Sequence, residues 1–86
     1  MEIYGVERVV KGMQFRHVGY SLQRKTLCWN VEAGVCRSLL GEVKWSHRWV
    51  RYCFFPVDGS YYDQNRLRGI ADFCEEFTRR QKEGRL

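Results

Sequence analysis

This chain of 86 residues has little proline, little histidine and no long apolar run. One Pro and eight Gly exclude a flexible linker or a collagen-like repeat. No segment approaches the roughly 18 consecutive apolar residues that a membrane-spanning helix needs. Residues 1–7 lack the basic and apolar regions of a signal peptide. We therefore expect a cytoplasmic protein with no membrane partner.

The sequence also lacks the spacings that bind metals or form redox pairs. No Cys-x-x-Cys motif occurs among its four cysteines, which are Cys28, Cys36, Cys53 and Cys74. A reducing compartment disfavours two disulfides and favours small buried residues with free thiols. His17 and His47 have no metal-spaced neighbour, so we predict neither a metal site nor a cofactor.

The usual catalytic motifs are missing as well. There is no Gly-x-Ser-x-Gly elbow, no phosphate-binding loop and no dinucleotide fingerprint. Glu75 and Glu76 would diverge by about 100° on a helix, so they do not face one cleft. Cys74 falls in an apolar helical stripe, where burial suppresses the reactivity of a thiol. The sequence therefore predicts a protein that is not an enzyme.

What the chain does contain is material for one core and an excess of arginine. It is 44% apolar and 15% aromatic, which argues against disorder, and its length suits a single domain over residues 1–86. Eleven of the fifteen basic residues are Arg, and the net charge is +5. Because the guanidinium group fits phosphate and carboxylate, the charge indicates nucleic acid or an acidic protein surface as partner.

The first part of the chain, residues 1–39, predicts N-terminal strands joined by short turns. Residues 15–20 and 26–31 are rich in β-forming residues. In the second of these segments every other side chain, from Leu27 onward, falls on one face. Gly34 then supplies a turn, because glycine takes positive φ at no steric cost.

The middle of the chain, residues 40–62, predicts a β-hairpin core. Gly41 suits a bulge or a close backbone approach. Residues 42–45 alternate strictly between apolar and charged side chains, which is typical of a half-buried strand. Residues 46–48 have the length of a hairpin turn. Residues 49–55 are apolar on both faces, so we expect a central strand covered on both sides.

The last part, residues 63–84, predicts a helix. Asp63 is placed to cap its N-terminus. Apolar residues recur at helical spacing, at Leu67, Ile70, Ala71, Cys74 and Phe77, with Phe73 widening the stripe. Basic residues gather at the far end, where they suit the helix dipole: Arg79, Arg80, Lys82 and Arg85. The predicted fold is α+β, an antiparallel β-meander of three to five strands with one C-terminal amphipathic helix packed on one face.

One constellation of residues points to a ligand. Basic side chains and aromatic rings alternate over nine residues, and the candidate binding residues are Lys44, His47, Arg48, Trp49 and Arg51. Strands that present arginine and aromatic rings together contact phosphates and stack bases. The alternative is structural, with Trp45 and Tyr52 in the core and the arginines as a solvated rim.

Residues 40–77 also carry a recognisable pattern. It reads Leu40-Gly41, Val43-x-Trp45, Trp49-x-x-Tyr52-x-Phe54-x-Pro56 and Leu67-x-x-Ile70-x-x-Phe73. This pattern resembles that of small bacterial and phage proteins, in which Arg occupies the place that Val50 holds here. The resemblance implies a core of two or three strands with one helix, and an origin in a phage or mobile element. It implies no activity.

These observations predict a small, non-enzymatic, basic binding module that contacts nucleic acid through a sheet and turn surface. One alternative is a protein-binding accessory factor or inhibitor, directed at a host defence system, with no nucleic-acid role. Another is a self-assembling domain, such as a homodimer, that uses an exposed edge strand in residues 57–62.

Overall fold

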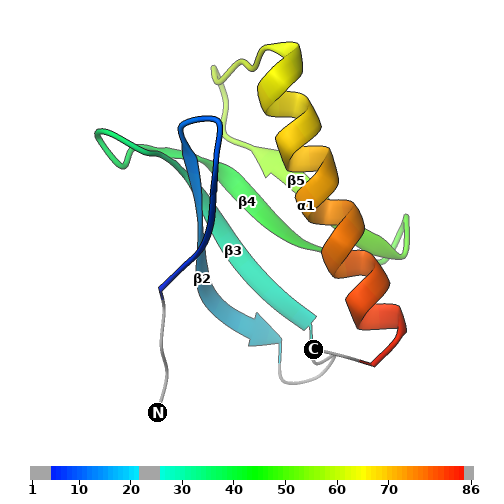
Figure 1. Cartoon of the computed structure of the whole chain (residues 1–86). Helices are drawn as coiled ribbons and strands as arrows, with labels where there is room; N and C mark the ends of the chain where they lie inside the picture. The colour runs from blue at the N-terminus through cyan, green and yellow to red at the C-terminus, as the bar shows by residue number, and fades with distance from the viewer. Residues whose placement is uncertain (1–4, 22–25, 85–86) are drawn as a thin grey trace.

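The chain forms a five-stranded antiparallel sheet followed by one helix (Figure 1). The computed structural model describes residues 5–21 and 26–84. Residues 1–4 and Arg85, on which the sequence analysis also drew, lie outside the described residues. The strands are β1 (Val6–Val10), β2 (Met13–Ser21), β3 (Thr26–Ala33), β4 (Leu39–Ser46) and β5 (Arg51–Pro56), and the helix is α1 (Gln64–Lys82). Each strand pairs with the next in sequence, which confirms the predicted α+β meander.

The helix lies across one face of the sheet (Figure 1), and residues of both outer strands are hydrogen-bonded to it. On one side, the guanidinium group of Arg8 in β1 binds the carboxylate of Glu76 in α1. On the other side, the backbone amide of Tyr52 in β5 donates a hydrogen bond of 2.9 Å to Thr78 Oγ1 in α1. The sheet therefore curves around the helix. Among the described residues, no helix is long and apolar enough to cross a membrane.

The core lies between the helix and the concave face of the sheet. Its fully buried members come from four strands and the helix: Met13, Phe15, Trp29, Val31, Val43, Tyr52, Ile70, Phe73 and Phe77. The Trp29 ring is central, with ring centroids of Tyr52, Phe73 and Phe77 at 5.4, 4.9 and 4.7 Å. Edge-to-face and tilted ring pairs at such distances are favourable. The predicted alternation in β3 and β4 is thereby confirmed, because Trp29, Val31 and Val43 all face the helix.

The helix begins as predicted but presents a different stripe. Asp63 caps it, accepting a hydrogen bond of 2.9 Å from the backbone amide of Arg66. Leu67, however, is 51% exposed, and the buried positions include Gly69 and Phe73. A Cβ atom at Gly69 would lie 2.7 Å from the side chain of Val10, so β1 packs directly on the helix there. That contact with β1 turns the helix so that Phe73 is central.

The expected central strand at residues 49–55 is wrong in two respects. The strand begins only at Arg51, and β5 is an edge strand whose outward-facing Phe55 is 41% exposed. Residues 57–62 form no strand, so the exposed edge expected there is also wrong. Thr78 covers part of the β5 edge instead, which protects a strand that would otherwise be open to pairing.

Two glycines have the close approaches that their positions demand. A Cβ atom at Gly41 would lie 2.6 Å from the Phe55 carbonyl oxygen, which confirms the predicted close approach. The backbone amide of Gly34 donates a hydrogen bond of 2.7 Å to the Gly12 carbonyl. Gly34 does not take the predicted positive φ, because the left-handed residue of this loop is Arg37, with φ of 60°.

Candidate functional site

The basic side chains divide into those with and without an acidic partner. Within residues 5–21 and 26–84, six form ion pairs: Arg8, Arg16, Arg37, Lys44, Arg66 and Arg80. The other basic residues of these ranges, which have no ion pair there, are Lys11, Arg48, Arg51, Arg68, Arg79 and Lys82. Four of the six unpaired cations belong to one surface, formed by the turn between β4 and β5 and by the groove beside it.

The β4–β5 turn, residues 47–50, is held in one conformation by hydrogen bonds to Ser46. The Ser46 carbonyl accepts a bond of 2.8 Å from the amide of Val50, and Ser46 Oγ accepts one of 3.1 Å from the amide of Trp49. Val50 has φ of 56°, a left-handed conformation that a β-branched residue rarely adopts. The turn therefore projects the Trp49 side chain, which is 62% exposed, from a hydrogen-bonded backbone.

Two arginines contact Trp49, one that precedes it in the sequence and one that follows it. The guanidinium carbon of Arg48 lies 5.5 Å from the centroid of the Trp49 ring, a cation–π distance. Arg51 Nε donates a hydrogen bond of 3.2 Å to the carbonyl oxygen of Trp49. Trp49 therefore has one positive charge over its exposed ring and a second at its backbone carbonyl.

A groove of about 590 Å³ continues from this turn, between β5 and α1. Its lining, which we call the cationic groove, consists of Arg51, Tyr52, Ala71, Cys74, Glu75, Thr78, Arg79 and Lys82. The hydrogen bond from the Tyr52 amide to Thr78 Oγ1 holds the two walls together. Three of the lining side chains are cationic and one, Glu75, is anionic, so the groove carries a positive balance. Arg51, the first residue of β5, links the two, because it lines the groove and is hydrogen-bonded to Trp49 in the turn.

Tyr52 lies at the base of the groove and connects β5 to α1 and β3 by hydrogen bonds. Its side chain is buried, its hydroxyl donates a bond of 2.9 Å to Gln81 Oε1 and it accepts one of 2.9 Å from the Leu27 amide. Burial raises the pKa of this phenol. Trp45 packs edge-on against it, with ring centroids 5.1 Å apart. Tyr52 thus belongs to the core and Trp45 packs against the core, as the structural alternative expected for these two residues, and Tyr52 also lines the groove.

The predicted site residues do not all come together. His47, Arg48, Trp49 and Arg51 lie in or beside the β4–β5 turn, and all four are exposed. Lys44 lies on the sheet face opposite α1, with its ammonium 3.3 Å from a Glu42 carboxylate oxygen and 4.8 Å from the Phe55 ring centroid. Lys44 therefore points along the strand away from the turn.

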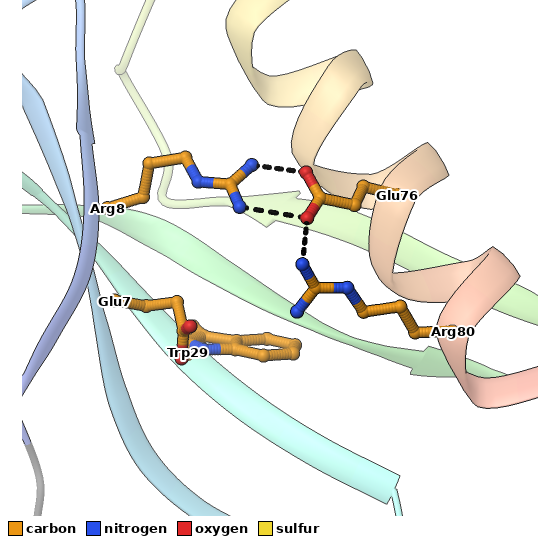
Figure 2. A network of polar contacts seen from close by, with 5 residues as sticks. All are labelled: Glu7, Arg8, Trp29, Glu76 and Arg80. Atoms are coloured by element: carbon orange, nitrogen blue, oxygen red, sulfur yellow. Dashed lines mark hydrogen bonds and ion pairs between the residues drawn. The ribbon is translucent and has the colours of Figure 1, made fainter. Parts of the chain in front are cut away.

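Sequence reasoning missed Arg79 and Lys82 as site residues, because a basic helix end is usually solvated. Their spacing of three residues places them on one helix face, a signal that was available in the sequence. Arg80, which lies between them in sequence, takes no part. It binds the Glu76 carboxylate at 2.6 Å, and Arg8 binds the same carboxylate with both Nη atoms, as Figure 2 shows.

The four thiols offer no reactive pair at this surface. Cys74 lies in the groove wall, where burial raises its pKa to about 12. Burial also raises the pKa of Cys28. Cys36 is exposed, contrary to the expectation of a buried thiol, and a hydrogen bond with Ser38 lowers its pKa. Within the described residues, no three His, Cys, Asp or Glu side chains gather as a metal site.

This surface therefore combines an exposed indole, a groove between β5 and α1, and four cations that form no ion pair within residues 5–21 and 26–84. Comparisons of the chain with protein-family models, with curated proteins and with solved structures find no match.

Proposed function

We propose that this chain is a non-enzymatic module that binds nucleic acid through the β4–β5 turn and the cationic groove. The observation that carries the proposal is the clustering of unpaired cations around an exposed tryptophan. Arg48, Arg51, Arg79 and Lys82 form no ion pair within the described residues. Of the eight other basic residues that the structure describes, six form ion pairs with carboxylates of the protein itself.

Unpaired cations suit a phosphate backbone for an energetic reason. A cation already paired must give up its carboxylate before it binds a phosphate, whereas an unpaired one gives up only water and counterions. Arg51 uses Nε for the Trp49 carbonyl, so its two Nη groups stay free to donate to phosphate oxygens. The aromatic ring adds a stacking surface, the other element that recurs in nucleic-acid-binding grooves.

The groove has little that would support catalysis. Its acid, Glu75, has no second acid beside it among the described lining residues, and its thiol, Cys74, is protonated at neutral pH. A general acid–base mechanism needs groups that exchange protons near the operating pH. A binding role without chemistry is therefore the simpler account of this groove.

One feature favours a protein partner as the second candidate. Val50, beside Trp49, is more than half exposed, and an apolar tip flanked by arginines has the composition of a protein-interface hot spot. The partner would be an acidic protein surface, which includes the accessory or inhibitor role considered above. The cations of the groove reach beyond this tip, and a repeating phosphate backbone accounts for all of them together.

The proposal is tested by fluorescence anisotropy with labelled DNA and RNA at about 50 mM and about 200 mM salt. We expect binding at low salt that weakens at high salt, because phosphate contacts release counterions. Arg79→Ala and Lys82→Ala should each weaken binding roughly fivefold, for a contact of about 1 kcal/mol. Lys44→Gln is the matched control, since it removes one exposed cation outside the groove and should leave affinity unchanged.

Absence of binding to every nucleic acid at about 50 mM salt would overturn the proposal. Equal losses in Lys44→Gln and Arg79→Ala would show that net charge, and not this surface, is responsible. Binding to an acidic protein with these nucleic acids ignored would establish the second candidate in its place.

A further inference from the structure

We propose that the ligand of this surface is a single strand, with one base stacked on Trp49 and its phosphates along the cationic groove. This inference rests on the proposed function and names the class of nucleic acid that the same surface takes. Three observations carry it: the exposure of the Trp49 ring, the contacts that Arg48 and Arg51 make with Trp49, and the two helix cations, Arg79 and Lys82, that line the groove.

The Trp49 ring suits an unpaired base. Two of the three tryptophans pack inside the fold, Trp29 in the core and Trp45 against it, so Trp49 is the exposed one. Among the described residues, a cation but no aromatic ring stacks on the Trp49 indole. In a duplex the faces of the bases are stacked on one another, whereas a single strand offers them to an aromatic side chain. An exposed indole is therefore of most use to an unpaired strand.

Arg48 and Arg51, the two arginines that contact Trp49, are poorly placed to recognise a duplex. Base sequence in a duplex is recognised by side chains that extend into the major groove and form paired hydrogen bonds to base edges. Here Arg48 lies over the Trp49 ring, and Arg51 is folded back onto the Trp49 carbonyl. With one guanidinium group at the ring and the other at the backbone of the same residue, both can meet phosphates next to a base stacked on Trp49.

The groove is open to solvent, and its two walls are in hydrogen-bonding contact, from the Tyr52 amide to Thr78 Oγ1. Arg79 and Lys82, about one helical turn apart, line this groove and can meet successive phosphates of an extended strand.

The experiment compares a labelled 12-nucleotide thymidine strand with a 12-base-pair duplex at about 50 mM salt, by anisotropy. We expect the single strand to bind at least about tenfold more tightly. Trp49→Ala should weaken single-strand binding roughly 5- to 150-fold, the range for loss of one base–aromatic stack. Trp49→Phe should restore most of it. Tyr61→Ala is the control, because Tyr61 is 92% exposed and lies outside this surface.

Each result separates this inference from the proposed function. Equal or tighter binding of the duplex, with Arg79→Ala still harmful, overturns the single-strand inference and leaves the proposed function standing. Full single-strand affinity in Trp49→Ala also overturns it, because the ring would then not stack on a base. Failure of both nucleic acids to bind overturns both proposals. Circular dichroism of each variant confirms that a loss of binding is not a loss of fold.

Discussion

At the scale of the residue, Val50 is the most strained position beside the candidate site. Its φ of 56° places Cβ close to the following carbonyl oxygen, which costs about 1–2 kcal/mol for an ordinary residue. Its side chain is more than half exposed, so packing of that side chain offsets little of the conformational free energy. The conformation persists because Ser46 binds the amides of Trp49 and Val50. Such strain is found where a chain must hold a functional side chain in place.

We predict that Val50→Asn stabilises the protein, because asparagine tolerates the left-handed conformation. A gain of about 1 kcal/mol corresponds to a rise in Tm of roughly 4–8 °C for a domain of this size. Thermal unfolding followed by circular dichroism measures it. Val35→Asn is the control, since Val35 is fully exposed and has no positive φ. An unchanged or lower Tm in Val50→Asn would show that the turn is not strained.

Residue-level predictions from sequence succeeded where the cause is local. The alternation from Leu27 and the cap at Asp63 depend on near neighbours, and both appear in the structure. The positive φ expected at Gly34 belongs to Arg37, because the Gly34 amide is fixed by the Gly12 carbonyl of another strand pair. The exposure of Leu67 likewise follows from the packing of β1, which a pattern of spacings within the helix does not contain.

At the scale of the elements, an ion-pair network fastens β1 to α1 (Figure 2). Arg8 forms two hydrogen bonds to the Glu76 carboxylate, at 2.5 and 2.9 Å, and Arg80 binds the same carboxylate. The Arg8 guanidinium also lies 5.5 Å from the Phe73 ring centroid. Beside it, Trp29 Nε1 donates a hydrogen bond of 3.5 Å to Glu7. The network closes the concave face of the sheet over the helix, and a two-pronged arginine–carboxylate pair is the strong form of such a contact.

The pH dependence of stability should report this network. The hydrogen bonds from Arg8, followed by the charges of Arg8, Arg80 and Arg79, lower the pKa of Glu76 below its ordinary value near 4.5. A lowered pKa in the folded state means that the stabilisation is complete above pH 4.5 and is lost as pH falls through the folded value. Glu76→Gln should therefore destabilise the protein by about 1–2 kcal/mol at pH 7 and by much less near pH 3.

Urea unfolding of both proteins at the two pH values measures the difference. Glu75→Gln, a change at the neighbouring exposed glutamate, should show no difference at either pH. A Glu76→Gln deficit that is the same at pH 3 and pH 7 would show that lost packing, and not the charge, is responsible.

Most strands and the helix could be predicted from the sequence, whereas the contacts between them and their positions in the sheet could not. The order of strands and the single helix follow from turn residues and periodicity. A register shift between His17 and Gly19 breaks the alternation of β2, which hides the length of that strand from its pattern. Arg8 and Glu76 are 68 residues apart, so no local spacing pairs them. The edge position of β5 is likewise a property of the assembled sheet.

At the scale of the whole molecule, the basic residues fall into two groups: those that form ion pairs within the fold and those that form none among the described residues. A net charge of +5 indicates an anionic partner but does not locate its surface. Lys44 and Arg79 are both charged and exposed, and sequence offers the first as the better candidate. In the fold, Lys44 pairs with Glu42 of its own strand on the sheet face opposite α1, whereas Arg79 lines the groove and forms no ion pair within the described residues. Which sheet face a side chain shares with the helix depends on the assembled sheet, so only four of the five predicted site residues meet at one surface.

This distribution predicts how binding depends on salt. For a single strand, each neutralised phosphate contributes about −0.7 to the slope of log K against log salt concentration. Contacts from Arg48, Arg51, Arg79 and Lys82 should therefore give a slope of about −3. Titrations between about 50 and 200 mM salt measure it, because affinity in this range follows the counterions released.

Removing one contact should change that slope by one increment. Arg79→Ala should make it less steep by about 0.7, whereas Lys44→Gln, with the same loss of charge, should leave it unchanged. A slope near zero would place the binding energy in stacking and apolar contacts at Trp49 and Val50, not in phosphates. An equal change in both variants would mean that the ligand senses the total charge of the molecule. A change of slope in Arg79→Ala but not in Lys44→Gln requires the phosphates to lie in the groove. Both variants lose one positive charge, and Arg79 lines the groove whereas Lys44 does not.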